Sequence, residues 1–176
     1  MPGMWWLLGA LAVVAVLAYL AWTDHRVERV HVRAQSGARA LDAHLLRRAA
    51  AAAVVGEHLD SVELYAAARL ALDAGPDERE AAENDLTRQL QAAPLNGTDP
   101  ATVMLIATSR RVVLARQVHT DLVRDALTAR RRLLVRALRL ARRFERPRYF
   151  DIVDPTLLVP VTPRPAEPAD LRIPAA

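Results

Sequence analysis

The chain has 176 residues, which is enough for one domain together with a membrane anchor and a tail. Hydrophobic residues make up 52% of the chain and aromatic residues only 5%, so alanine, leucine and valine supply most of the apolar surface. Alanine and leucine lose little side-chain entropy in a helix, so this composition predicts an all-α fold and argues against a multistranded sheet. The chain contains no cysteine, which excludes a disulfide framework, a thiolate nucleophile and a cysteine-based zinc site.

All 24 residues counted as lysine or arginine are arginine, because the chain contains no lysine. The formal net charge is +4 and the isoelectric point is near 10.5. Such a balance suits an anionic partner, either lipid headgroups or nucleic acid.

The first predicted element is a transmembrane helix over residues 4–22. These 19 residues contain no charge, which is about the length needed to cross roughly 30 Å of hydrocarbon. Trp5 and Trp6 lie at one end of the segment, and Tyr19 and Trp22 lie at the other, as expected of aromatic residues at the two water interfaces. No basic residue precedes the segment, whereas three arginines follow within eleven residues, so the positive-inside rule predicts an external N-terminus and a cytoplasmic domain in the cell membrane. A cleaved signal peptide is the alternative interpretation.

Four helices are expected in the domain. The anchor continues as a helix until Gly56, because apolar or small residues recur at steps of three and four. Asp60 with Glu63 predicts a capping box for a second helix, and Asp77 with Glu80 predicts one for a third. Asp99-Pro100 predicts the start of a long last helix, which extends to about Phe144.

Short turns between these helices favour an up-and-down four-helix bundle. The predicted organisation is a stub at residues 1–3, the transmembrane helix at 4–22, a helical bundle domain at 23–150 and a Pro-rich tail at 151–176 that is disordered or extended.

The arginine-rich last helix is the main candidate for binding. Between Arg110 and Arg148 the chain has thirteen arginines and three acidic residues. In a continuous helix, Arg132, Arg136, Arg139 and Arg143 would share one narrow arc, opposite a broad leucine face. In an up-and-down bundle this end returns to the bilayer, so we expect these four residues, with Arg146 and Arg148, to contact anionic lipid or a protein partner.

Two other interpretations of the arginines stay open. They form a solvated face of a bundle helix, or they bind nucleic acid. The chain has no helix-turn-helix, zinc finger or aromatic ladder, so phosphate attraction alone would give non-specific binding.

Several positions along the chain resemble the LemA family of bacterial membrane proteins, over roughly residues 19–150. On the first helix the matching positions are Asp42, Leu45 and Arg47-Arg48-Ala49; on the last they are Ala115-Arg116, Asp121, Val123-Arg124-Asp125 and Thr128, and Tyr149-Phe150 match at the end. The chain departs from the family where it has Ser36, Ala38, residues 50–53, Ser109, Thr120 and Leu127. The resemblance implies a membrane-anchored helical bundle without catalytic activity.

The sequence offers no constellation for catalysis or for metal or cofactor binding. The five histidines include no pair three or four residues apart on a helix, and no phosphate-binding glycine loop or nucleophile elbow occurs. We therefore expect no catalytic, cofactor-binding or metal-binding residues and no cofactor. The predicted role is structural: a membrane-tethered scaffold or adaptor that binds a protein partner or itself. The alternative is a membrane-tethered nucleic-acid-binding protein.

Overall fold

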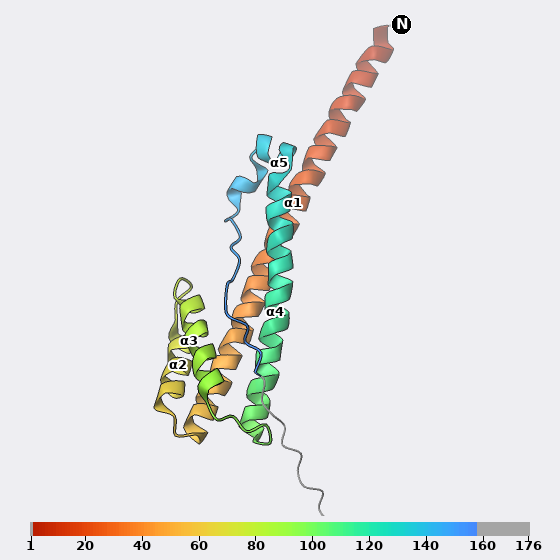
Figure 1. The fold of residues 1–176 in the computed structure, drawn as a ribbon. Coiled ribbons are helices and arrows are strands. Elements are labelled where there is room, and N and C mark those ends of the chain that lie inside the picture. The colour runs from red at the N-terminus through yellow and green to blue at the C-terminus, as the bar shows by residue number, and fades with distance from the viewer. Residues whose placement is uncertain (1, 158–176) are drawn as a thin grey trace, which may run out of the picture.

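A computed structural model describes residues 2–157 of the chain, without the side chains of residues 2–5, 133, 134 and 143 (Figure 1). The elements in chain order are α1 (Pro2–His58), α2 (Val62–Asp73), α3 (Arg79–Ala92), α4 (Pro100–Arg131), α5 (Leu133–Ala137) and the 3₁₀ helix η1 (Leu140–Arg143). No strand occurs among the described residues, so the prediction of an all-α fold is confirmed.

Helix α1 joins the apolar N-terminal segment to the rest of the molecule without a break. It spans 57 residues, and its N-terminal part projects beyond every other element (Figure 1). The apolar side chains there are exposed, as Trp6 at 82%, Leu11 at 66% and Leu17 at 59% show. This one helix is long and apolar enough to cross a membrane, and its apolar window is not the buried core of the described structure.

The domain is a long antiparallel pair of helices that carries a short hairpin at its far end. Helix α4 has 32 residues and runs back along α1, whereas α2 and α3 have only 12 and 14 residues and pack beside the C-terminal part of α1 (Figure 1). The predicted up-and-down bundle with four helices side by side is therefore replaced by a two-helix stalk and a local hairpin. The largest apolar cluster lies where the hairpin meets the stalk, and includes Val55, Leu64, Leu86, Leu90 and Leu105.

A buried ion pair fixes α3 against α1. Both side chains of the Arg48–Glu83 pair are fully buried, with Arg48 Nη1 at 2.8 Å from Glu83 Oε2. Arg48 Nη2 also donates to the Thr87 hydroxyl at 2.8 Å, and that hydroxyl donates to the Glu83 carbonyl. Burial raises the pKa of the Glu83 carboxyl, because loss of hydration outweighs the attraction of Arg48. The pair thus joins two helices whose sequences give no periodic signal for it.

Of the three N-cap residues predicted from the sequence, the structure confirms one. Asp99 caps α4 as predicted, since its Oδ2 accepts from the Thr102 backbone N–H at 2.9 Å. Helix α2 is capped by Ser61, which accepts from the Leu64 N–H, so the expected Asp60 cap is wrong; Asp60 instead adopts a left-handed conformation at φ 51°. Helix α3 follows a turn that ends at Glu78, without the predicted Asp77 cap.

Gly56 allows the tight connection between α1 and α2. A Cβ atom at this position would lie 2.9 Å from the backbone nitrogen of Tyr65, closer than real contacts of that kind. The absence of a side chain therefore lets α2 fold back directly onto the end of α1.

Residues 150–157, which we call the C-terminal strap, are extended and packed onto the stalk. Ile152 is 4% exposed and lies against Leu41, Leu45 and Val112. The Asp151 N–H donates to Glu80 Oε1 at 3.1 Å and the Val153 N–H to Asn84 Oδ1 at 2.8 Å. Of the two expectations for the tail, residues 151–157 therefore fit the extended one and not the disordered one, whereas residues 158–176 lie outside the described part of the chain.

Candidate basic site at the anchor end

The arginine-rich segment is not one helix. Helix α4 ends at Arg131, because Arg132 takes an extended conformation (φ −60°, ψ 133°), and Arg139 is left-handed at φ 54°. The predicted continuation to Phe144 is wrong, and with it the single arc of Arg132, Arg136, Arg139 and Arg143. The chain instead turns through α5 and η1 beside the first turns of α1 that follow the apolar segment (Figure 1).

The predicted arginines divide into two groups by position. Arg132, Arg136 and Arg139 are exposed around α5, at the end of the domain next to the anchor; Arg143 is in the same place along the chain, but its side chain is outside the described part. Arg146 and Arg148 are also exposed, but lie on the segment that leads away from the anchor, and Arg148 is 3.8 Å from Asp77 at the start of the α3 turn. Of the predicted arginines whose side chains are described, only Arg132, Arg136 and Arg139 therefore lie at the end of the domain next to the anchor.

A small apolar cluster attaches this end to α1. It consists of Val27, Val135 and Ala141, with Leu140 and Phe144 packed against it. Val135 is 1% exposed and Val27 is 2% exposed, so the contact between α5 and α1 excludes water. This contact fixes the position of α5 along the axis of α1.

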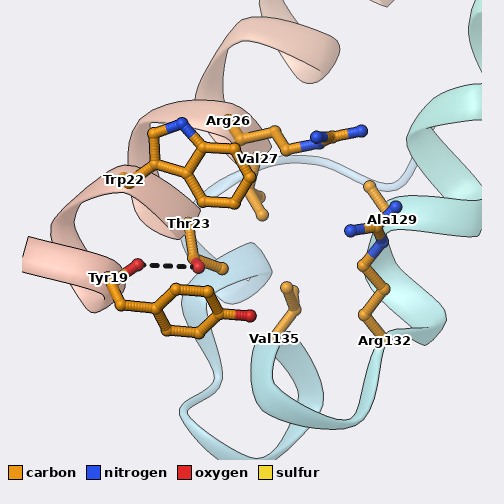
Figure 2. A pocket seen from close by; sticks show the side chains of 8 residues that line it. All are labelled: Tyr19, Trp22, Thr23, Arg26, Val27, Ala129, Arg132 and Val135. Atoms are coloured by element: carbon orange, nitrogen blue, oxygen red, sulfur yellow. Dashed lines mark hydrogen bonds between the residues drawn. The ribbon is translucent and has the colours of Figure 1, made fainter. Parts of the chain in front are cut away.

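Beside this cluster lies an open cavity of about 400 Å³, which we call the interface notch (Figure 2). Its walls come from α1 and from the α4–α5 junction, and it is lined by Tyr19, Trp22, Thr23, Arg26, Val27, Ala129, Arg132 and Val135. The notch thus combines aromatic and aliphatic surface with two guanidinium groups from separate helices.

The predicted aromatic residues have different settings at the two ends of the apolar segment. Trp6 is almost fully exposed, and the side chain of Trp5 is outside the described part. Tyr19 and Trp22 are each 50% exposed, and their ring centroids lie 6.1 Å apart. The guanidinium carbon of Arg26 lies 5.6 Å from the Trp22 ring centroid, a cation–π contact.

A hydrogen-bonded bracket below the notch was not predicted from the sequence. The buried His31 ring donates from Nδ1 to the Val27 carbonyl at 2.8 Å, since a carbonyl can only accept. Its Nε2 is then free to accept from Arg130 Nη1 at 3.2 Å, and the same Nη1 donates to the Phe144 carbonyl at 3.1 Å. The Phe144 ring stacks on His31 with centroids 4.8 Å apart.

Burial lowers the pKa of His31, and the positive charge of Arg130 acts in the same direction against the raising effect of the Val27 hydrogen bond. His31 is therefore a neutral structural residue of the bracket. Burial also lowers the pKa of His119. Within residues 2–157 no group of three or more His, Asp or Glu side chains could hold a metal ion.

Comparison of the chain with protein-family models, with curated proteins and with solved structures finds no match. The site is therefore interpreted from its geometry alone. From the sequence, Arg26 was expected only to orient the anchor and Arg130 only to belong to the arginine-rich helix, and His31 was given no role, so their contacts here were not predicted. Arg26 could have been noticed, because it lies four residues after Trp22 and so on the same helix face. Arg130 and His31 meet only through the antiparallel packing of α4 on α1, 99 residues apart.

Proposed function

We propose that the chain is a single-pass membrane protein whose domain has a structural or interaction role at the cytoplasmic face, as a scaffold or adaptor rather than an enzyme. The observation that carries this proposal is the continuity of α1 from the apolar segment into the folded domain. A helix that is shared by anchor and domain needs no flexible linker. The domain would then keep a fixed position relative to the bilayer.

The shape of the domain suits a spacer that carries a terminal module. From Trp22 to His58 an α-helix rises about 50 Å at 1.5 Å per residue. The α2–α3 hairpin packs on the last turns of this helix, so in a membrane it would be held well away from the headgroups (Figure 1). We propose that a protein partner or a second copy binds at that end.

The proposed orientation depends on the charges that flank the apolar segment. Arg26, Arg29 and Arg33 follow it, and the arginines of α5 are brought to the same side by the fold. Arginines on one side of a span favour the cytoplasm for that side. We therefore propose an external N-terminus and a cytoplasmic domain.

The LemA resemblance supports the same kind of role, and we propose that the chain is a LemA-like protein. Its matching positions have packing functions here: Arg48 forms the buried ion pair, and Leu45 and Ala49 are buried. Asp42 lies 3.5 Å from Arg79 across α1 and the start of α3. Residues that hold the fold together are consistent with an interaction protein.

A nucleic-acid-binding role has less support than it had from the sequence. The alternative depended on a continuous arginine-rich last helix that attracts phosphates, and α4 ends at Arg131 in the described part of the chain. We therefore do not put forward a nucleic-acid complex as a second proposal.

Cysteine labelling in intact cells tests the anchor and its orientation, because the chain has no cysteine of its own. Ala66→Cys is suitable because Ala66 is exposed on α2, whereas Ser61 is needed as a helix cap. We expect the protein to stay in the membrane pellet at alkaline pH, and a membrane-impermeant maleimide to label it only after lysis. Labelling of intact cells would reverse the orientation, and release into the supernatant would contradict the anchor.

A further inference from the structure

We propose that the interface notch is a binding site for the phosphate headgroup of one anionic phospholipid. The proposal rests on the membrane insertion put forward above, and it adds a ligand class and a site to it. Arg26 and Arg132 bind the phosphate, and the apolar wall of the notch receives the upper part of an acyl chain.

The two guanidinium groups form the polar part of the site. Figure 2 shows Arg26 from α1 and Arg132 from the α4–α5 junction extending to the same side of the notch. Neither has a carboxylate partner in the ion pairs found within the described residues. A guanidinium donates two parallel hydrogen bonds to phosphate oxygens, so two of them can surround one headgroup.

The ion pairs found within residues 2–157 do not join an acidic side chain of α1 to Arg26 or Arg132. Glu28 lies 3.7 Å from His25, and Asp24 has an interaction of its own. Arg26 is instead held by the face of Trp22, which leaves its guanidinium hydrogen atoms available to an anion. The Thr23 hydroxyl donates to the Tyr19 carbonyl at 2.8 Å, so the side-chain donors of the notch that can reach a ligand are the two guanidinium groups, the Tyr19 hydroxyl and the Trp22 indole N–H.

The depth of the notch corresponds to the phosphate layer of a bilayer. Tyr19 and Trp22 end the uncharged segment, where aromatic rings lie at the boundary between hydrocarbon and headgroups. Arg26 is one helical turn further along α1, or about 6 Å beyond Trp22. The charged end of the notch is therefore level with phosphates, and its aromatic end is level with the first methylene groups.

The size and wall of the notch fit one lipid better than a diffuse layer of counter-ions. Its volume of about 400 Å³ accommodates a glycerol phosphate group, and Tyr19 and Val135 lie on its apolar side (Figure 2). Arg136 and Arg139 are exposed on the outside of α5 and do not line it. A specific site should thus depend on Arg26 and Arg132 more than on these neighbours.

Native mass spectrometry of the full chain in detergent, with phosphatidylglycerol or phosphatidylcholine added, tests the proposal. We expect one tightly retained phosphatidylglycerol and no comparable phosphatidylcholine adduct. The variant Arg26→Gln/Arg132→Gln should weaken that adduct by tenfold or more, on the order of what two lost arginine–headgroup contacts imply. The matched control Arg29→Gln/Arg136→Gln removes the same charge from exposed residues outside the notch and should retain the lipid.

A second variant separates the site from overall charge. Ala129→Trp keeps both arginines but fills the notch, so it should also lose the adduct, with helicity checked by circular dichroism. Equal weakening in the matched control, or retention by Arg26→Gln/Arg132→Gln, would overturn the proposal in favour of diffuse attraction. Displacement of the lipid by excess inorganic phosphate would also overturn it, because the site would then recognise the free anion. If a variant loses the lipid adduct but stays in the membrane pellet at alkaline pH, only the lipid site in the notch is affected. If the protein is released from that pellet, the proposed membrane anchor itself is contradicted.

Discussion

At the scale of single residues, Arg48 and Glu83 form a buried ion pair in which each charge depends on the other. Desolvation of two charges costs several kcal/mol, and the attraction between them offsets it only while both are present. Arg48 Nε and Glu83 Oε1 have no hydrogen-bond partner among the described atoms, which adds to this cost. Replacing both residues is therefore less harmful than replacing one.

We predict that Glu83→Ala lowers the free energy of unfolding by about 3–5 kcal/mol, because it leaves the Arg48 charge buried without a partner. The double variant Arg48→Met/Glu83→Leu should recover most of this loss. The measurement is chemical denaturation of the full chain in detergent, followed by circular dichroism. If the single and double variants are equally destabilised, the pair contributes no more than its packing volume.

At the scale of elements, the break after Arg131 shows why local periodicity failed at the end of α4. A helix continued for twelve more residues would extend about 18 Å further along α1. Counted from the contact of Arg130 with His31, it would carry Arg139 to the level of Trp22, and Arg142 and Arg143 to the level of the uncharged segment. In the membrane span proposed above, a charged side chain at that depth costs several kcal/mol. No glycine or proline marks the break, so the signal lies in the packing of Val135 on Val27 and not in the local sequence.

Elements with strong local signals were predicted correctly from the sequence. The uncharged run and the small residues at steps of three and four give α1, and Asp99-Pro100 gives the start of α4. The site was predictable only in part: the basic, aromatic end of the anchor was expected, but the notch was not. Arg26 and Arg132 are more than a hundred residues apart in the sequence and line the same notch only because of the fold. The periodicity of a single helix gives no information about such long-range neighbours.

The packing of the C-terminal strap was also missed, because the prolines after residue 154 predict an irregular tail, whereas the strap is held by contacts with α1, α3 and α4. Glu80 and Asn84 are one helical turn apart, about 6 Å along α3, which matches about 6.6 Å between alternate residues of an extended chain. Their side chains therefore accept from two alternate backbone N–H groups of the strap, those of Asp151 and Val153. Ile152, between these two, points into the stalk.

We predict that Ile152→Ala detaches the strap, at a cost of about 2 kcal/mol or more for a buried isoleucine. Hydrogen exchange at the Asp151 and Val153 amides should become faster, while exchange in the middle of α4 stays unchanged. Val153→Ala is the control, since Val153 is 50% exposed and a surface change there should stay within about 0.5 kcal/mol. Similar exchange rates in both variants would mean that the strap is held by its hydrogen bonds alone.

At the scale of the whole molecule, the continuous α1 and the antiparallel α4 make the domain a stiff rod. The two helices are joined near the anchor by the Val27–Val135 cluster and the His31–Arg130 bracket, and at the far end by the hairpin core. A rod attached at both ends cannot bend easily between them. Any flexibility between the apolar segment and the domain must therefore arise close to Tyr19 and Trp22, the first residues of α1 that line the notch with residues of the α4–α5 junction.

A flexible insertion at that point gives the last prediction. In nanodiscs, a fluorophore on Ala66→Cys should lie about 50 Å from acceptor lipids at the near surface, because α1 rises 1.5 Å per residue from Trp22. Inserting a Gly-Ser linker between Trp22 and Thr23 should shorten the mean distance and broaden its distribution, since the domain could then tilt toward the headgroups. An Ala-rich helical insertion of equal length is the control, and should keep the distribution narrow. A broad distribution in the unaltered chain would mean that anchor and domain move independently, and that α1 does not act as a spacer.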